Sequence, residues 1–408
     1  MHLVFINQYY PPDGAPTGIA LAAVAEELAA QGHEVTVICA EGGYAGMRHE
    51  TARHKTQKEE VIHVIRIRAT RFGRATFLCK LLDYFSYYLG VAWQLAVMLP
   101  KPNRIVALTT PPYLSLLARV ISKLRGADHA HWVMDIYPDV MVAHGILRQN
   151  SLAHRALAWL ARWGMGGKRC AAVLTLGPDM AERLKRRGTQ NSSSANHLIS
   201  WVPLWSSGNK TADDLAVIKR RHEMGWRDDE LIVMYSGNMG LGHRFGEILE
   251  VGGQSSENGE RFVFFGGGKR RGEIAEFIEN HPNAPVELHD YASAENLAVH
   301  LQSADVHLVS LDAKWSGTML PSKLQGIFAA GRPLIFIGDA KSSIAKWVNQ
   351  SAGGWIVAPG DVRGLRDAIV QAHDPRVRNA CGIAAKAFAE ANFNQQTNVR
   401  QVADILVY

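Results

Sequence analysis

Three glycine-rich turns hold residues suited to binding chemistry. Each follows a predicted strand and precedes a predicted helix, and they span Gly14–Gly18, Gly237–Gly242 and Gly266–Gly268. Backbone N–H groups at a helix N-terminus, together with the positive end of the helix dipole, can bind an anion such as phosphate. Glycine is also the ordinary residue of tight turns. One such turn alone is therefore weak support for a ligand site.

Lys323 is a further candidate, in the segment 317–336 (GTMLPSKLQGIFAAGRPLIF). The pattern predicts a loop, a helix from about Lys323, and a buried strand after Pro333. The helix dipole disfavours a cation in the first turn, so a lysine there suits a bound anion such as a diphosphate. The alternative is an ordinary surface lysine whose alkyl chain packs on its neighbours.

Other nucleotide and metal motifs are not indicated. The first turn is not GxGxxG, and Glu41 is the one acid near the end of the next predicted strand, so NAD binding is not favoured. No GxxxxGK[ST] loop is present, and no DxD stands at a predicted strand end, which argues against a metal.

The cysteines and histidines suggest no zinc site by spacing. Without CxxC or a nearby histidine, neither a disulfide framework nor structural zinc is predicted, and a reducing cytoplasm fits better. His129 and His131 alternate on a predicted buried strand and are interpreted as structural. The four cysteines are far apart: Cys39, Cys79, Cys170 and Cys381.

Apolar runs of strand length alternate with helical stretches along most of the chain. This alternation predicts an α/β fold of two successive doubly wound parallel sheets, with ligands at the carboxyl ends of the strands. A polar, Ser/Asn-rich stretch at 183–200 is interpreted as the crossing between domains. We expect domains at 1–203 and 204–385, and a C-terminal helix and tail at 386–408 that packs back on the N-terminal domain.

Composition narrows the class of protein. The chain has 408 residues, 47% hydrophobic and 20% charged, with 44 Lys+Arg against 38 Asp+Glu. These values are typical of a globular protein and exclude a disordered chain, a collagen-like fibre and a coiled-coil rod. The first residues lack the basic region and long apolar core of a signal peptide. The longest apolar stretch, 84–99, is interrupted by Gln94, so we expect no membrane span.

The segment 63–104 combines cations with aromatic residues. Such a composition suits the interface of an anionic bilayer. The alternative is a domain helix whose aromatic residues are core. The cations are Arg66, Arg68, Arg71, Arg74, Lys80, Lys101 and Arg104, and the aromatic residues are Phe72, Phe77, Tyr84, Phe85, Tyr87, Tyr88 and Trp93.

Six stretches in order resemble the retaining GT-B glycosyltransferases of family 4, in particular the WbuB-like enzymes of bacterial O-antigen and exopolysaccharide assembly. They are NQYYPPDGAPTG with LAAQGHEVTVI, TTPPYLSLLA, MDIYPDVMVAHGIL, YSGNMGLGHRFGEIL, FFGGGKRR and LPSKLQGIFAAGRP. The resemblance covers nearly the whole chain. It implies two Rossmann-like domains, with the acceptor bound by 1–203 and the nucleotide-sugar by 204–385.

The resemblance also assigns donor-binding positions. Gly14 would lie beneath the donor diphosphate, and Asn238 stands where the family usually has arginine. The usual Lys-Gly pair falls on His243 and Arg244, either of which would supply the cation. The further donor-side residues expected are Gly237, Gly267, Tyr291 and Ser322.

The E-x7-E motif of the family is absent. Aligned on Gly331-Arg332-Pro333, its glutamates fall on Thr318 and Gly326. We therefore expect Lys323, with the backbone N–H groups of Met319 and Leu320, to hold the donor.

On the acceptor side, MDIYPD resembles the family's DxWP segment. Asp135 is expected to face the acceptor, and a turn carboxylate is the alternative. Asp13 and Thr17 in the first turn are the other acceptor-side candidates.

The predicted function is transfer of a sugar from a nucleotide diphosphate, UDP favoured, to a lipid-linked (polyprenyl diphosphate) glycan, with retention and without a metal. Asp135, Lys323 and Arg244 are the predicted catalytic residues. The enzyme is expected at the cytoplasmic face of the inner membrane, with no nucleic-acid partner. A nucleotide-sugar 2-epimerase of the same fold and a non-catalytic nucleotide-sugar-binding protein are the alternatives.

Overall fold

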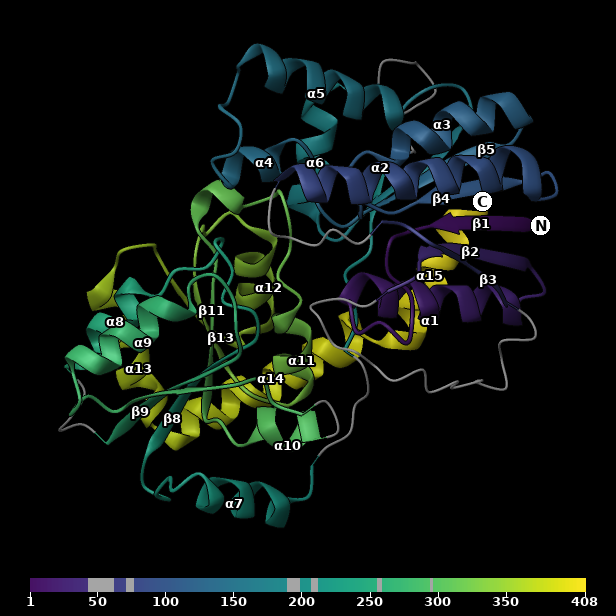
Figure 1. The fold of residues 1–408 in the computed structure, drawn as a ribbon. Coiled ribbons are helices and arrows are strands. Elements are labelled where there is room, and N and C mark those ends of the chain that lie inside the picture. Colours follow the sequence, from purple (N-terminus) through teal and green to yellow (C-terminus); the bar gives the residue numbers. More distant parts are fainter. Residues whose placement is uncertain (43–61, 71–76, 189–198, 207–211, 255–258, 294–295) are drawn as a thin grey trace. The chain divides into compact units, whose positions relative to one another are not determined.

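The chain forms two compact units, each built on one parallel sheet (Figure 1). The computed structural model describes residues 1–408 except 43–61, 71–76, 189–198, 207–211, 255–258 and 294–295. Unit 1 comprises Met1–Pro203 and Gln396–Tyr408, and unit 2 comprises Leu204–Gln395. None of the described helices combines the length and hydropathy needed to span a bilayer.

Unit 1 contains a seven-stranded sheet in the order β3-β2-β1-β4-β5-β6-β7, with every neighbouring pair parallel. Short apolar runs form these strands because both faces of the sheet are covered by helices. The order reverses at β1, which places a topological switch point between β1 and β4. The strands are β1 (His2–Ile6), β2 (Glu34–Ala40), β3 (Ile62–Ile67), β4 (Arg104–Ala107), β5 (Asp128–Val133), β6 (Cys170–Thr175) and β7 (Ile199–Trp201).

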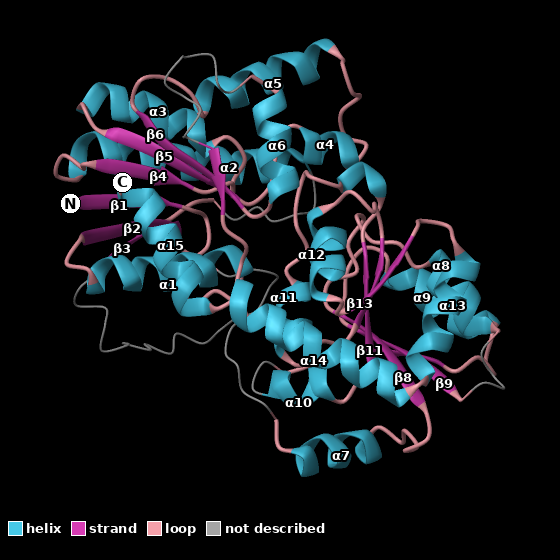
Figure 2. Ribbon diagram, turned by 180° about the vertical axis from the view of Figure 1, so that it is seen from behind, coloured by secondary structure: helices cyan, strands magenta, loops and turns pink. Residues whose placement is uncertain are grey.

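Helices lie on both faces of this sheet (Figure 2). The buried side chains of Tyr87, Val91 and Leu95 pack α2 and the π-helical turn η2 against the core of β1 and β4. On the other face, α15 is anchored where Arg104 Nη1 donates to the Leu406 carbonyl at 2.5 Å. The helices are α1 (Pro16–Ala30), α2 (Phe77–Trp93), η2 (Gln94–Met98), α3 (Leu114–Arg125), α4 (Asp139–Ala143), α5 (Leu152–Gly164), α6 (Pro178–Arg186) and α15 (Gln395–Val407).

Two sequence-based expectations about connections are corrected. The stretch 183–200 is not only a crossing: its first residues complete α6, and Ile199 begins β7, which pairs with β6. A three-residue edge strand is too short to show a periodic pattern. The C-terminal tail is helical, and the break between units falls after Gln395 and not at 386, because 386–392 continues a helix of unit 2.

Unit 2 contains a six-stranded parallel sheet in the order β10-β9-β8-β11-β12-β13, which reverses at β8. Helices α8 (Gly246–Gly253), α9 (Arg271–Asn280) and α13 (Val362–His373) cover one face through Ile248, Ile274 and Leu365 (Figures 1 and 2). The switch point lies between β8 and β11. The strands are β8 (Leu231–Ser236), β9 (Glu260–Phe265), β10 (Val286–His289), β11 (Val306–Ser310), β12 (Leu334–Ile337) and β13 (Gly354–Val357).

The helices of unit 2 follow the predicted alternation with strands. They are α7 (Asp214–Glu223), α8 (Gly246–Gly253), α9 (Arg271–Asn280), α10 (Leu297–Gln302), the 3-10 turn η5 (Ala313–Trp315), α11 (Lys323–Ala329), α12 (Ser343–Ser351), α13 (Val362–His373) and α14 (Pro375–Asn392). The glycine-rich turns 237–242 and 266–268 follow β8 and β9, and Lys323 begins α11. Each candidate residue of unit 2 is thus held at a strand end or a helix start.

Candidate functional site

The two glycine-rich turns of unit 2 pack tightly against each other and against Lys323. Gly237 has φ +130°, and a Cβ placed on it would lie 2.7 Å from Lys323 Cε. A Cβ on Gly266, at φ +129°, would clash with the Gly237 carbonyl. Side chains are excluded at both positions by conformation and by space. The glycines therefore bring the backbone of both turns close to the lysine.

The amine of Lys323 is half-buried and has no acidic partner. Its Nζ donates to the hydroxyl of Tyr235, lies 3.7 Å from the centroid of that ring and reaches the Asn238 carbonyl at 3.5 Å. No carboxylate of the described residues pairs with it. Loss of hydration lowers the pKa of Lys323 well below its usual value. Such an amine at the carboxyl edge of the sheet is suited to an anion.

His243 and Arg244 lie at the switch point between β8 and β11. The Nδ1–H of His243 donates to the Ser310 carbonyl at 2.6 Å, and the N–H of Arg244 donates to Ser310 Oγ at 3.0 Å. Burial lowers the pKa of His243 to about 3, so the imidazole is neutral and holds the loop to β11. Of the two residues predicted to supply a cation, Arg244 is the one that carries a charge in this arrangement.

Arg244 is already paired with two carboxylates. Its Nε donates to Glu247 Oε1 at 2.7 Å, and Nη1 lies 3.7 Å from Asp312 Oδ2. Glu247 is buried and also accepts from the Gly360 N–H at 2.6 Å. Its hydrogen bonds and the charge of Arg244 overcome the effect of burial and lower the pKa of Glu247. The charge of Arg244 is thus largely compensated, whereas that of Lys323 is not.

The other predicted donor-side residues surround these turns. The Tyr291 hydroxyl donates to the Gly267 carbonyl at 3.4 Å, and a Cβ on Gly267 would lie 3.1 Å from the Tyr291 ring. Thr318, in contrast, is buried and donates to the Trp315 carbonyl at 2.7 Å, so its hydroxyl serves the loop that precedes α11. Asn238 and Ser322 are exposed, Met319 is half-buried and Leu320 is buried.

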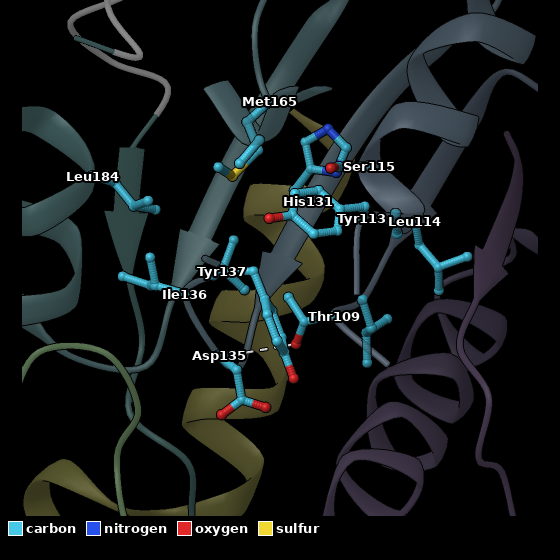
Figure 3. Close-up of a pocket in the computed structure, with 14 residues that line it drawn as sticks. Thr109, Tyr113, Leu114, Ser115, His131, Asp135, Ile136, Tyr137, Met165 and Leu184 are labelled. Carbon is cyan, nitrogen blue, oxygen red and sulfur yellow. Dashed lines mark hydrogen bonds between the residues drawn. The ribbon is translucent and has the colours of Figure 1, made fainter. Parts of the chain in front are cut away.

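Asp135 follows β5 at the carboxyl edge of the unit 1 sheet. Its backbone N–H donates to Thr109 Oγ1 at 3.3 Å, which ties it to the end of β4 (Figure 3). No described residue donates a hydrogen bond to its carboxylate, which points away from Met165 and His131 in the same view. Burial raises the pKa of Asp135 to about 6. A carboxylate with this pKa is ionised at neutral pH yet basic enough to accept a proton.

Aromatic side chains surround Asp135. Tyr113 and Tyr137 lie with ring centroids 6.2 Å apart, and both line a cavity of about 30 Å³ with Thr109, Asp135 and His131. Tyr113 has φ +67°, which is rare for a bulky side chain and is typical of constrained functional segments. The hydroxyl of Tyr113 is buried without a hydrogen-bond partner among the described residues.

The first turn of unit 1 is more ordinary in structure. Asp13 is buried, and its Oδ1 accepts from the Ala15 N–H at 3.2 Å, an arrangement typical of a turn. Gly14 has open space where a Cβ would be, and Thr17 lies in the first turn of α1. The structure places these three together after β1 but on a different loop from Asp135.

Sequence reasoning missed several contacts at both edges. Lys323 contacts Tyr235, Arg244 contacts Glu247 and Asp312, and Asp135 contacts Thr109, across 3 to 88 positions of sequence. Tyr113 lines the same cavity as Asp135. Tyr113 directly follows the adjacent prolines of TTPPY, which is the one signal that could have marked it.

Known proteins are similar to this chain in sequence and in fold. Residues 17–194 match the family described as "Glycosyl transferase 4-like domain". WcaI of Escherichia coli K12, provisionally assigned as a colanic acid biosynthesis glycosyl transferase, is 24% identical over 98% of both chains.

Solved structures show the same fold. WaaG, a glycosyltransferase involved in lipopolysaccharide biosynthesis, aligns with TM-score 0.69 and 16% identity over 99% of both chains. Anabaena Alr3699/HepE in complex with UDP-glucose aligns with TM-score 0.72 and 13% identity over 100% of this chain and 99% of that one. The two Rossmann-like sheets thus form a GT-B fold. Residues 17–194 are therefore similar to a glycosyl transferase 4-like domain, within a chain that has the GT-B fold.

Proposed function

We propose that this chain is a glycosyltransferase that transfers a sugar from a nucleotide diphosphate, UDP favoured, to a lipid-linked glycan in the synthesis of bacterial surface polysaccharide. The WcaI name supports the biological role, and HepE, which has the same fold, was crystallised with UDP-glucose. A polyprenyl diphosphate glycan is the proposed acceptor, and the configuration at the transferred carbon is retained.

The unpaired amine of Lys323 is the observation that carries the proposal. A half-buried ammonium without a carboxylate is costly unless an anion neutralises it. A diphosphate at the ends of β8 and β9 would meet this amine and the backbone of the turns at Gly237 and Gly267. The exposed ring of Tyr291 beside Gly267 offers a flat apolar surface to the nucleoside.

Catalysis then depends mainly on stabilising the leaving group. As the bond between sugar and diphosphate breaks, negative charge grows on the phosphate oxygen, and a positioned cation lowers the energy of that transition state. Lys323 is the proposed source of that charge, and Arg244 adds less because Glu247 and Asp312 offset it. Family 4 enzymes are generally metal-independent, and no step proposed here needs a metal.

Asp135 is the proposed group for the acceptor. A carboxylate with a pKa of about 6 and no intramolecular hydrogen bond among the described residues is free to accept one from the attacking hydroxyl. It would also offset positive charge on the sugar ring in the transition state. Asp13 is less suited to this role because it is held by its own turn.

Membrane association is proposed through an apolar stripe on α2 and η2. Leu81, Phe85, Leu89, Trp93 and Val97 recur every four residues and are each between 45% and 61% exposed, while the buried stripe lies on another side of the same helix. Exposed Arg68 and Lys101 add positive charge near an anionic surface.

Part of the sequence-based interpretation of segment 63–104 is corrected. Arg104 and Tyr87 are buried, so neither contacts a membrane. Arg71, Arg74 and Phe72 lie outside the described residues, as do the side chains of Lys80 and Phe77.

The catalytic proposal is tested with the purified chain. Thermal shifts with UDP, GDP, dTDP and ADP identify the base, because a ligand that binds the native state raises the melting temperature. UDP-sugars are then incubated with membranes that contain lipid-linked glycans. We expect label in the lipid fraction and release of UDP. Epimerised free donor without lipid label would instead indicate an epimerase, and binding without turnover a non-catalytic protein.

The membrane proposal has its own test. Phe85→Ser with Trp93→Ser should abolish most flotation with anionic liposomes, because both side chains are more than half exposed. The matched control is Ile383→Ser, an apolar residue of unit 2 that is 73% exposed. Equal flotation of the double variant and the control would reject the stripe as the contact.

A further inference from the structure

His129, His131 and Cys170 form a buried cluster inside unit 1, and His131 lines the same cavity as Asp135. The two histidines alternate on β5, and Cys170 begins β6 directly opposite His129. One donor atom from each residue, a ring nitrogen or the Sγ, lies within 4.8 Å of the other two. All three side chains are at most 5% exposed.

Most ring nitrogens of this cluster lack hydrogen bonds. Both ring nitrogens of His131 and the Nε2 of His129 lack a hydrogen-bond partner among the described residues. The Gly164 backbone lies near His131 and the Gly166 backbone near His129, without well-formed hydrogen bonds to these three nitrogens. The exception is His129 Nδ1, which contacts Ser122 Oγ at 3.1 Å. Unsatisfied buried nitrogens are costly, so three at one place require an explanation.

The contacts of the three side chains leave ligand atoms for a metal. The contact to Ser122 leaves Nε2 of His129 as the ligand atom, as in many metal sites where a second partner orients the ring. The Cys170 thiol donates to the Met165 carbonyl at 3.2 Å, and binding a metal through sulfur would replace that weak hydrogen bond.

The geometry points to a structural zinc site formed by His129, His131 and Cys170. Two imidazoles and a sulfur are typical zinc ligands, and Zn²⁺ imposes no electronic preference for geometry. Binding would release one proton: Zn²⁺ and the Cys170 thiol give a zinc–thiolate bond and H⁺. The cavity of about 30 Å³ that His131 lines with Ser115 and Met165 has room for a water beside His131 (Figure 3).

One nearby charge opposes the ion. The guanidinium of Arg119 lies close enough to lower the pKa of both histidines, and it is held by the Trp163 carbonyl and ring. The thiolate formed on binding would offset part of this repulsion. The site would join β5 to β6 four residues before Asp135, so its proposed role is to stabilise unit 1.

The test measures metal in the full-length chain after removal of any affinity tag. Elemental analysis should find close to one zinc per chain, and Co²⁺ added to chelator-treated protein should produce a thiolate-to-cobalt charge-transfer band. Cys170→Ser should remove that band and weaken zinc binding by at least ~10²-fold, since even indirect partners of a metal cost 10–100-fold. Cys39→Ser is the control, because Cys39 is equally buried but lies on β2.

Two results would overturn the site: no zinc and no cobalt band in the wild type, or equal loss in the Cys39→Ser control. If Cys170→Ser fails to fold, His131→Gln decides, since it keeps a polar group of similar length. Zinc should raise the melting temperature of the wild type but not of His131→Gln, and an equal shift in both would count against the site.

Discussion

The proposed donor side in unit 2 and the proposed acceptor side in unit 1 are built differently although both lie at the carboxyl edge of a Rossmann-like sheet. On the donor side, Gly237, Gly266 and Lys323 fit together with little free space, and Arg244 is held by two carboxylates. On the acceptor side, Asp135 stands beside tyrosines with one backbone hydrogen bond to Thr109.

This difference has a physical reason. A diphosphate is common to all nucleotide-sugars, and a rigid set of backbone groups and one cation can bind it without reorganisation. A proton acceptor depends more on a suitable pKa than on rigid surroundings. Partial burial beside aromatic rings raises the pKa of a carboxylate. Substitutions should therefore affect rate on the acceptor side and nucleotide affinity on the donor side.

The largest effect is expected for Asp135→Asn. The change keeps the size but removes the charge and the basic site, so turnover should fall by at least ~10²-fold. Nucleotide affinity, measured by titration calorimetry, should stay near wild type. A parallel loss of folded protein and activity would identify Asp135 as a turn residue instead.

The pH dependence of the same variant sharpens this test. With a pKa of about 6, Asp135 should lose activity as the pH falls through 6 in the wild type. The pKa of Asp135 is higher in the folded chain than its value of about 3.9 in the unfolded chain, so the protonated carboxyl favours the fold. This contribution to the free energy of unfolding is complete below about pH 3.9 and is lost as the pH rises through about 6. Asp135→Asn should therefore show no activity step near pH 6, and its melting temperature relative to wild type should rise between pH 4 and pH 7.

Lys323→Ala should have the next largest effect, now on affinity. It removes a charge-assisted contact to phosphate worth about 1.5–3 kcal/mol, a loss of roughly ten- to hundredfold in nucleotide binding. Because burial lowers the pKa of Lys323, nucleotide affinity of the wild type should also weaken as the pH rises and the amine loses its proton. Wild-type affinity in the Ala variant would remove Lys323 from the donor site.

Most strands could be predicted because buried parallel strands appear in the sequence as short apolar runs. Strand β7 could not, because its three residues are too few to show a hydrophobic pattern. Lys323 and the glycine turns could be predicted from residue type and position in the chain. The contact of Lys323 with Tyr235 could not, because 88 residues separate them. The absence of a nearby histidine argued against zinc at Cys170, yet pairing of β5 with β6 brings two histidines to it.

Gly237→Ala should produce a smaller, mixed effect. Alanine at φ +130° is strained by about 1–3 kcal/mol, and its Cβ would push against Lys323 Cε. We expect a melting temperature lower by several degrees and weaker nucleotide binding. Gly272→Ala is the control, since it lies in α9 with open space around a Cβ. Equal melting temperatures of both variants would show that the turn can adapt.

Arg244→Ala should have the smallest effect on the donor side. Arg244 carries a full charge, but Glu247 Oε1 at 2.7 Å and Asp312 Oδ2 at 3.7 Å offset it before any nucleotide binds. A cation already engaged in this way adds about 1 kcal/mol or less to a new anion, so nucleotide affinity should fall less than about fivefold. The double variant with Lys323→Ala tests independence: the two losses should add if the cations act separately. A loss in Arg244→Ala as large as that in Lys323→Ala would mean that a bound diphosphate breaks the pair with Glu247, and the donor side would then be less rigid than its packing indicates.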